Sequence, residues 1–477
     1  MNKLKLFLEN FLVYGLGGVI NKIIPLIMVP IVTRMMPSSE YFGVNDLSHT
    51  LISFCSAFAI MGMYDAMYRM FFEKEEKENQ KKVCSTALCF TLVTSVVVFL
   101  IMLLFKSFIS SYFFGGKEYI NVVYLSAIAT LVGSTNSIIA APTRMQNNRK
   151  IYLLANIASP MLSYAMSIPL LLKGYYLIAL PLSGVISGIT LELFFLCLNR
   201  GWFKIRLFDA KLLKQMLLIG VPLLPNFLVY WLFNSCDKVM ITNMIGIGAA
   251  GIYSVGSKLG HASQLIYTAF AGGWQYFSFS TMKEKNQVES NSKIFEYLGI
   301  ISFIATAFIC SISYIFYDVL FTKEYLEGFI VAPYLFLAPL LQMLFQVAAN
   351  QFIIIKKTWP NMLILSAGAG INLILNFILI PSLGIEGAAI ATLIGYFVSD
   401  IICVVVLIRM KLMSISSKFV FSAILIAVFI VVWRCFMSSN FVITVLLAVF
   451  LSILYGILYR GEIFTVISKF RKDEYKN

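Results

Sequence analysis

Long apolar runs recur along the whole chain, and they constrain its fold more than any other feature. The chain of 477 residues is 60% hydrophobic and only 13% charged, whereas a soluble globular chain is about 45–50% apolar and about 25% charged. Each run is about 20 residues long, the length that an α-helix needs to cross a bilayer. Inside a bilayer, backbone N–H and C=O groups must be paired within the protein, so a span is either a helix or a strand of a closed barrel. The ten-residue strands of alternating polarity that build such a barrel are not seen. The sequence therefore predicts an all-α polytopic membrane protein.

Fourteen of these runs are predicted to be membrane-spanning helices. The first is expected to stay in the chain, because it is 23 residues long, contains Lys22 and lacks the small-residue cleavage site of a signal peptide. The predicted spans cover residues 11–33, 44–66, 83–105, 119–141, 151–172, 175–198, 215–235, 248–276, 294–317, 329–353, 361–381, 385–408, 418–437 and 440–459.

The positive charges predict the orientation of these spans. Loops on the side of the N-terminus hold 28 Lys and Arg residues, and loops on the opposite side hold 7. Because cytoplasmic loops are enriched in Lys and Arg, both termini are expected to be cytoplasmic. The net charge of +14 then reflects orientation and contact with anionic membrane lipids, and a nucleic acid partner is not expected. No loop exceeds about 20 residues, which leaves no room for a soluble domain.

The chain contains an internal repeat. VTRMMPSSEYFGV (32–44) is similar to ITNMIGIGAAGIY (241–253), which places Gly43 over Gly251, and GYYLIALPLSG (174–184) aligns with GIEGAAIATLI (384–394). Two six-helix lobes of the same orientation are the parallel-repeat plan of secondary transporters, and two C-terminal helices follow them. The predicted domains are 1–200 (helices 1–6), 201–214 (a cytoplasmic linker), 215–410 (helices 7–12) and 411–477 (helices 13–14 and a cytoplasmic tail).

The repeat also explains the stretch GIGAAG (246–251), which matches the dinucleotide-binding pattern G-x-G-x-x-G. That pattern has meaning only between a strand and a helix. Here it is the second copy of the outer turn that reads PSSEYFG in the first half, and its small residues allow helices to approach closely. We therefore expect no nucleotide cofactor. The eight cysteines form no C-x-x-C pair and the chain has two histidines, so we expect no metal site.

Two segments carry a resemblance to a known family. NSCDKVMITNMIGIGAAGIYSVGSKLG (234–260) resembles the helix 7–8 segment of polysaccharide flippases, in which an Asp-Arg/Lys pair, a Gly-containing turn, a Gly-x-Tyr and a Lys recur in this order. TRMMPSSEYFGVNDL (33–47) is similar to the corresponding helix 1–2 turn. With its length and helix plan, the chain resembles the multidrug/oligosaccharidyl-lipid/polysaccharide (MOP) exporter superfamily, in particular the Wzx-type flippases of O-antigen and capsule repeat units.

This resemblance implies a transporter rather than an enzyme. Such a protein would move polyprenyl-pyrophosphate-linked oligosaccharides by alternating access, from the cytoplasmic to the outer leaflet of a bacterial inner membrane, for surface polysaccharide synthesis. Its implied partners are that lipid-linked oligosaccharide, H⁺ or Na⁺ as a coupling ion, and other polysaccharide assembly proteins. A cation-coupled multidrug exporter of the same superfamily is the alternative. A second alternative is a membrane-embedded enzyme that acts on lipid-linked sugars, although no loop carries paired carboxylates for catalysis.

Cations within or beside spans are candidates for binding the pyrophosphate, because an ionisable group at a span centre costs about 2.5–3.5 kcal/mol on insertion scales. Lys22 lies near the middle of the first span and Lys258 lies within the eighth. Arg34 and Arg69 lie near span ends and complete this cationic set. The alternative for Lys22 is a lysine that reaches the membrane surface or pairs with an acid.

Polar residues at helical spacing are candidates for contact with sugar hydroxyls, and polar bonding between helices is the alternative. Acids inside spans are candidates for ion coupling, and salt bridges are the alternative. His261 is either a packing histidine or a proton switch. The adjacent Asp237 and Lys238 are expected to brace helix 7. The sugar candidates are Ser254, His261, Gln342, Gln346, Asn350, Asn372 and Asn376, and the ion-coupling candidates are Asp65, Glu192 and Asp400.

Overall fold

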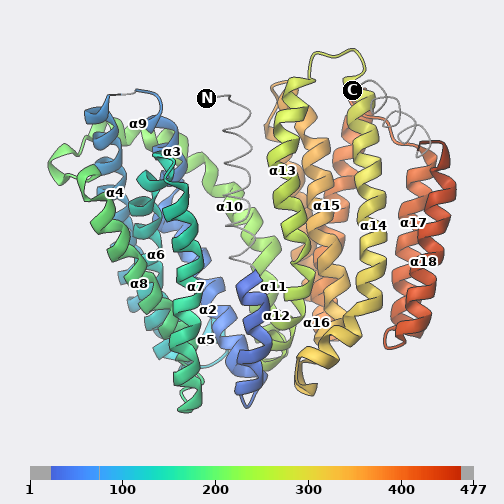
Figure 1. Cartoon of the computed structure of the whole chain (residues 1–477), viewed down its shortest axis with the longest axis horizontal. Helices are drawn as coiled ribbons and strands as arrows, with labels where there is room; N and C mark the ends of the chain where they lie inside the picture. Colours follow the sequence, from blue (N-terminus) through green and yellow to red (C-terminus); the bar gives the residue numbers. More distant parts are fainter. Residues whose placement is uncertain (1–22, 75, 463–477) are drawn as a thin grey trace. The chain divides into compact units, whose positions relative to one another are not determined.

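The computed structural model describes residues 23–74 and 76–462, and every regular element in these ranges is helical (Figure 1). Ten of the described helices are long and apolar enough to cross a membrane, or eleven if one bent pair is counted as a single span. The predicted class, an all-α multi-pass membrane protein, is therefore confirmed, with a lower number of separate spans than the fourteen predicted.

The helices follow the predicted spans closely in most of the chain. Their bounds are α2 (Ser39–Ile60), α3 (Met63–Phe71), α4 (Lys77–Leu104), α5 (Lys106–Phe114), α6 (Ile120–Met145), α7 (Arg149–Leu172), α8 (Ala179–Asn199), α9 (Ala210–Gly220), α10 (Leu224–Trp231), α11 (Asp237–Met244), α12 (Ile247–Gly260), α13 (Ser263–Ser280), α14 (Gln287–Leu320), α15 (Gly328–Ile354), α16 (Trp359–Arg409), α17 (Ser417–Val432) and α18 (Phe441–Leu458). A shorter apolar helix, Ile23–Met35, precedes them.

Several predicted spans differ from the observed helices at breaks or kinks of the backbone. The predicted spans 361–381 and 385–408 form one kinked element, α16, in which Gly384 has a φ of 61°. A positive φ is accessible to glycine without a steric penalty, so the chain turns there with almost no loop. The predicted span 248–276 is divided into α12 and α13, and the span 44–66 breaks at Gly62 with a bend of 49° between α2 and α3.

The first compact unit comprises Met1–Val255 and Asn372–Ala388. Two of its larger apolar cores lie at opposite ends of its helices. One gathers α3, α4, α6 and α9 around Met67 and Met216, and the other gathers α2, α4, α6 and α11 around Leu47 and Val239. The segment Ala210–Met244, which the repeat assigns to the second lobe, thus packs into this unit at both of its ends.

The segment Ala210–Met244 is interrupted twice along its length. A 3-10 turn, η4 (Val221–Leu223), follows α9, and a π-helical turn, η5 (Leu232–Cys236), follows α10. Close to the first break, Gly220 packs directly against Gly62, where a Cβ on Gly220 would lie 2.5 Å from the carbonyl oxygen of Met61. The bend between α2 and α3 therefore rests on the start of this segment, and a side chain at either glycine would push the two apart.

The second compact unit comprises Gly256–Ile371 and Ala389–Asn477. Its centre is α15, which is buried along almost its whole length and packs on α13 and α14. The last two helices, α17 and α18, pack on α14. Glu296 of α14 fixes the chain just before α17, because its carboxylate accepts hydrogen bonds from the backbone N–H and the hydroxyl of Ser416, at 2.6 and 2.8 Å.

A short motif recurs in the two halves of the sequence. The sequence Lys-Glu-Tyr forms a 3-10 turn twice, as η1 (Lys117–Tyr119) before α6 and as η6 (Lys323–Tyr325) before α15. Both tyrosines are buried. The Tyr119 hydroxyl donates a hydrogen bond to Glu40, whereas the Tyr325 hydroxyl has no hydrogen-bond partner among the described residues. The copies thus share a backbone but differ in their polar contacts.

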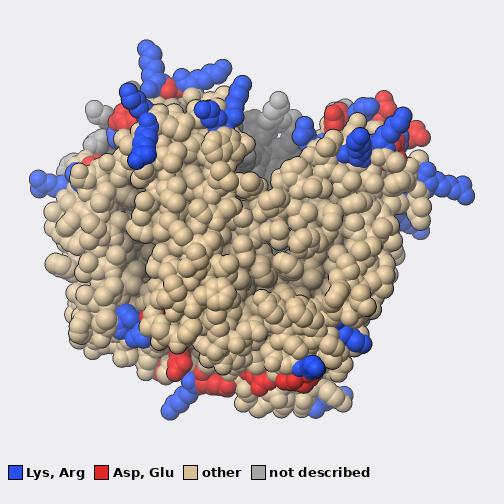
Figure 2. All heavy atoms as spheres, turned by 180° about the vertical axis from the view of Figure 1, so that it is seen from behind, with Lys and Arg blue, Asp and Glu red and all other residues tan. Residues whose placement is uncertain are grey.

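The described surface matches a protein in a bilayer. On the face drawn in Figure 2, nearly all charged side chains lie at the two ends of the helices, and the surface between them is uncharged. Many large apolar side chains of the described helices are exposed, including Leu104 and Leu172 at 78% and 76%. Such an uncharged band of exposed apolar side chains is expected to face lipid.

Candidate functional site

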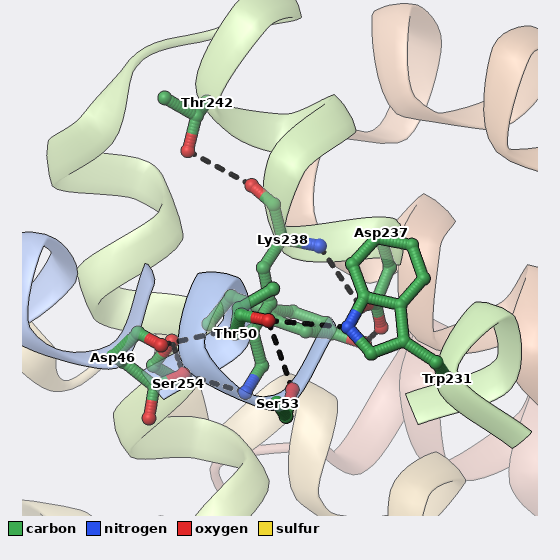
Figure 3. Close-up of polar contacts among 9 residues, drawn as sticks. Asp46, Thr50, Ser53, Trp231, Asp237, Lys238, Thr242 and Ser254 are labelled. Atoms are coloured by element: carbon green, nitrogen blue, oxygen red, sulfur yellow. Dashed lines mark hydrogen bonds and ion pairs between the residues drawn. The ribbon is translucent and has the colours of Figure 1, made fainter. Parts of the chain in front are cut away.

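Five buried polar and charged side chains meet where α11 and α12 contact α2, within the first unit (Figure 3). We call them the charge network: Asp46 of α2, Asp237 and Lys238 of α11, and Tyr253 and Ser254 of α12. The turn that joins α11 to α12 consists of residues 245–246, so the glycine-rich stretch 246–251 lies mainly in the first turns of α12.

The hydrogen bonds of the charge network join three helices. The Lys238 ammonium lies 2.5 Å from Oδ2 of Asp46, and the Ser254 hydroxyl donates to the same oxygen at 2.8 Å. The Tyr253 hydroxyl donates to the Asp237 carboxylate, which also accepts from the backbone N–H of Lys238 at 2.8 Å. Because Lys238 binds α2 and Asp237 binds α12, these two adjacent residues connect all three helices.

The charge network is almost fully shielded from solvent. The side chains of Lys238 and Asp46 are 12% and 7% exposed, and Asp237 is 3% exposed. A buried ion pair contributes little to net stability compared with apolar residues, but removing one partner costs about 3–5 kcal/mol because the other charge stays buried. The network therefore makes the contact of these three helices sensitive to its charge balance.

The local backbone explains why Asp237 and Lys238 reach different helices. They directly follow the π-helical turn η5 (Leu232–Cys236), and such turns inside α-helices occur frequently at functional sites. On the other side of η5, the indole N–H of Trp231 donates to the carbonyl oxygen of Thr50 at 3.2 Å. The turn is thus flanked by two contacts with α2, from Trp231 before it and from Lys238 after it.

Two glycines set the spacing between α2 and α12. A Cβ on Gly43 would collide with the carbonyl oxygen of Ile247, and a Cβ on Gly251 would collide with the carbonyl oxygen of Ser39. The separation in the sequence is 208 residues between Gly43 and Gly251, and it is the same between Ser39 and Ile247. The contact is therefore reciprocal, because the glycine of each copy of the repeat packs against the equivalent backbone carbonyl oxygen of the other copy. Small residues of this kind let membrane helices approach closely, as the sequence predicted for this turn.

The predicted cationic residues do not gather at this place. Lys22 lies outside the described residues. Lys258 is partly buried in α12, four residues after Ser254, while Arg34 and Arg69 are exposed. Asp65 is exposed on α3 as well, and the described residues contain no ion pair between Asp65 and Arg69.

The predicted polar stripes lie mainly in buried positions. In α15, Gln342 and Asn350 are buried, and the Asn350 amide donates to the Ser278 hydroxyl of α13. Gln346, between them, is partly buried, and its Oε1 has no hydrogen-bond partner among the described residues. In α16, Asn372 and Asn376 are buried, with the Asn376 amide 3.4 Å from Oδ1 of Asn372. His261 lies between α12 and α13 and is partly buried.

The predicted acids have different surroundings. The Thr135 hydroxyl donates to Glu192 at 2.5 Å, which joins α6 to α8. Asp400 of α16 is 6% exposed, and neither of its carboxyl oxygens has a hydrogen-bond partner among the described residues. A buried carboxyl group of this kind must bind a proton, a cation or water. Groups of three or more His, Cys, Asp or Glu that could hold a metal ion do not occur in the described part of the chain.

Outside the spans, the predicted linker 201–214 is fixed to the first unit. Ser85 accepts from the backbone N–H of Lys204 at 2.9 Å, and Thr86 accepts from that of Asp209 at 3.2 Å. Asp209 caps α9 and forms an ion pair with Lys82. The hydrogen bond from Lys82 lowers the pKa of Asp209 to about 2, so this ion pair persists at neutral and mildly acidic pH.

Sequence reasoning missed two members of the charge network. Asp46 lies three residues inside a predicted span and is the counterpart of Ser254 in the repeat, at the same separation of 208 residues as the paired glycines. An acid inside a span, opposite an Asp-Lys pair, was a signal that could have identified it. Tyr253 carried no comparable signal, since buried tyrosines are common in apolar helices.

Comparison with known proteins gives one family. The family described as "Polysaccharide biosynthesis protein" matches residues 31–330, more than half of the chain. An uncharacterized membrane protein of Methanocaldococcus jannaschii is 26% identical over 197 residues, which are 40% of this chain and 39% of that protein. The chain thus spans about two fifths of the length of this curated relative.

Solved structures share the fold. The lipid II flippase MurJ, in an inward closed conformation, matches with a TM-score of 0.70 at 15% identity, covering 96% of this chain and 99% of that one. An inward-facing multidrug resistance transporter of the MATE family matches with a TM-score of 0.64 at 17% identity, covering 82% and 94%. An outward-facing transporter of that family matches with a TM-score of 0.58 at 14% identity, covering 85% and 95%.

Proposed function

Because the chain belongs to the polysaccharide biosynthesis protein family, we propose that it is a membrane transporter of the MOP superfamily that acts as a flippase for lipid-linked oligosaccharides. Its substrate is a repeat unit on polyprenyl pyrophosphate, which it moves from the cytoplasmic to the outer leaflet of a bacterial inner membrane. The family match over residues 31–330 carries this proposal. The shared fold with a solved lipid II flippase supports it.

The proposal includes the two-lobe plan. We assign helices 1–6 to residues 1–200, the linker to 201–214, helices 7–12 to 215–410 and the last two helices to 411–477, with fourteen spans and both termini in the cytoplasm. The excess of Lys and Arg on one side supports this orientation. The reciprocal contact of Gly43 with Gly251 and the repeated Lys-Glu-Tyr turns support the relation between the lobes.

In this scheme the charge network is a latch on the outer side. Alternating access requires the outer ends of the helices to separate once in each cycle, and α11 and α12 are held to α2 by Lys238 and its partners. A latch made of a buried ion pair suits this task, because each charge regains hydration when the helices part. An apolar contact of the same area would gain no comparable hydration free energy when the helices part.

Substrate contact is assigned to the cationic and polar positions. Lys22, Lys258, Arg34 and Arg69 would bind the pyrophosphate, since ammonium and guanidinium groups form strong charge-assisted hydrogen bonds with phosphate oxygens. The buried amides of α15 and α16, with Ser254 and His261, would bind sugar hydroxyls. The polar atoms of Gln346 and Gln351 that lack partners among the described residues are consistent with this role.

Among the three candidate acids, Asp400 is our choice for the coupling ion. Its two carboxyl oxygens are buried and have no partner among the described residues, whereas Glu192 is occupied by Thr135 and Asp65 is exposed. A buried carboxyl group can exchange H⁺ or Na⁺ when a conformational change admits water.

The test is the lipid content of a strain that lacks the gene. Lipids of its cytoplasmic membrane are extracted and analysed by mass spectrometry while surface polysaccharide is stained. Accumulation of a completed polyprenyl-pyrophosphate oligosaccharide, with loss of the surface polymer, is the expected result. No accumulation together with increased sensitivity to cationic dyes would reject the flippase and favour the multidrug exporter.

A further inference from the structure

A second polar cluster lies in the first unit, at the opposite end of its helices from the charge network. It consists of Tyr64 and Tyr68 of α3, Arg144 in the last turn of α6 and Tyr152 in the first turn of α7. We call it the tyrosine-arginine cluster. By the proposed orientation it lies at the cytoplasmic end of the spans, where a lipid-linked substrate is assembled.

Arg144 is the centre of this cluster. Its Nη1 donates a hydrogen bond to the Tyr64 hydroxyl at 3.0 Å, and its guanidinium carbon lies 5.7 Å from the centre of the Tyr152 ring. These contacts hold the guanidinium between an aromatic face and a hydroxyl. A planar guanidinium fixed in this way is well suited to bidentate recognition of phosphate.

The tyrosines form an aromatic surface beside Arg144. The ring centres of Tyr64 and Tyr68 are 6.1 Å apart with an angle of 36° between the rings, and Phe72 continues the row 5.5 Å from Tyr68. Both tyrosines pack on the buried core that contains Met63 and Met67, so their positions are set by the core beneath them. A row of rings with polar tips offers apolar faces and hydrogen bonds together, which matches the C–H faces and hydroxyl edges of a sugar.

Accessibility distinguishes this cluster from the charge network. Tyr64, Tyr68, Arg144 and Tyr152 are all partly exposed, whereas the charge network is buried. The cluster thus combines a guanidinium, an aromatic surface and partial exposure.

We propose that the tyrosine-arginine cluster is a loading site for the substrate head group, in which Arg144 binds the pyrophosphate and the tyrosine rings bind the first sugar. This site rests on the proposed function and adds the place where the substrate is first recognised. In the proposed alternating-access cycle, loading at this site comes before the outer side opens.

The test measures binding to the purified full chain in nanodiscs of phosphatidylcholine. The probes are farnesyl pyrophosphate and farnesyl pyrophosphate that carries one hexose. Arg144→Lys is expected to weaken binding of both probes by about tenfold, because a lysine keeps the charge but not the bidentate geometry. Tyr68→Leu is expected to weaken only the sugar-bearing probe, by about three- to tenfold, because a ring contact is lost.

The other end of α6 offers a matched control. There the Lys106 ammonium lies 4.9 Å from the centre of the Tyr124 ring, so Tyr124→Leu removes a tyrosine from a similar cation-ring pair on the opposite membrane side. It is expected to leave both affinities unchanged. Tyr64→Phe, which removes only the hydroxyl that Arg144 contacts, keeps the test valid if a larger substitution prevents folding; its expected effect is a few-fold loss for both probes.

Two results would overturn the loading site. Unchanged affinities in Arg144→Lys and Tyr64→Phe would reduce the cluster to a structural feature of the membrane boundary. Equal displacement of both probes by phosphatidylglycerol in the nanodisc would make it a site for anionic phospholipid. Neither result would touch the proposed function, which is judged separately by the lipid that accumulates in the deletion strain.

Discussion

Breaking the charge network is expected to release the outer ends of α11 and α12 from α2. In Lys238→Met the ion pair with Asp46 is lost, and the buried carboxylate of Asp46 loses its cation. The paired side chains are 12% and 7% exposed and 2.5 Å apart, so the loss falls in the range for a broken buried pair, about 3–5 kcal/mol. A shift of about 3 kcal/mol changes the closed-to-open ratio on the order of 100-fold.

A natural thiol reports this opening. Cys236 is partly buried and directly precedes Asp237, so its reaction with a membrane-impermeant maleimide measures how often the network opens. The assay uses a chain in which the other seven cysteines are replaced. We expect slow labelling of Cys236 with the intact network and labelling faster by one to two orders of magnitude in Lys238→Met, up to the intrinsic rate of the exposed thiol.

The double variant supplies the control. Asp46→Asn with Lys238→Met removes both charges of the pair, and a neutral pair of similar size should restore much of the lost stability. Its Cys236 should therefore react more slowly than in Lys238→Met alone. The reasoning is refuted if Lys238→Met folds normally and labels at the original rate, or if the double variant labels as fast as the single one.

Four further outcomes are expected. Gly251→Val should reduce surface polysaccharide strongly, because its side chain collides with α2; normal display would refute the close contact. Asp209→Asn should lower the melting temperature by the same amount from pH 8 to pH 5, and the difference should vanish as pH falls from about 4 to about 2, since the lowered pKa keeps Asp209 charged above that range. Tyr325→Phe should leave the melting temperature unchanged or raise it, whereas Tyr119→Phe should lower it, since among the described residues the Tyr119 hydroxyl has a hydrogen-bond partner and the Tyr325 hydroxyl has none. Asp400→Asn should abolish flipping driven by an ion gradient while leaving downhill exchange; retention of gradient-driven flipping would exclude Asp400 as the coupling acid.

The fold class was predictable because apolar length is a property of the sequence alone. Runs such as 329–353 and 440–459 correspond to α15 and α18 within a few residues. The count of spans was harder to predict, because it depends on backbone breaks. Gly384 joins two spans into α16, and nothing in the local sequence distinguishes a kink at this glycine from a loop.

The candidate site was only partly predictable. The Asp237-Lys238 pair was identified as a brace of helix 7, and the structure gives it partners in two other helices. Its partner Asp46 is 192 residues away from Lys238, and a contact at such a distance depends on the tertiary fold. The sequence does not single out Arg144, because its surroundings depend on two other helices that bring Tyr64 and Tyr152 beside it.

The reciprocal glycine contact has the geometry of a dimer interface, in which the same surface meets itself across a two-fold axis. In a true homodimer, the position opposite Asp46 would hold a second Asp46, and two buried carboxylates would repel each other. Here that position holds Ser254, which donates a hydrogen bond instead. Joining both copies in one chain lets the residues beside the axis differ, so a single acid can be matched by a single lysine. The asymmetry that a homodimer cannot have is therefore what makes a charged latch possible at the centre of a symmetric contact.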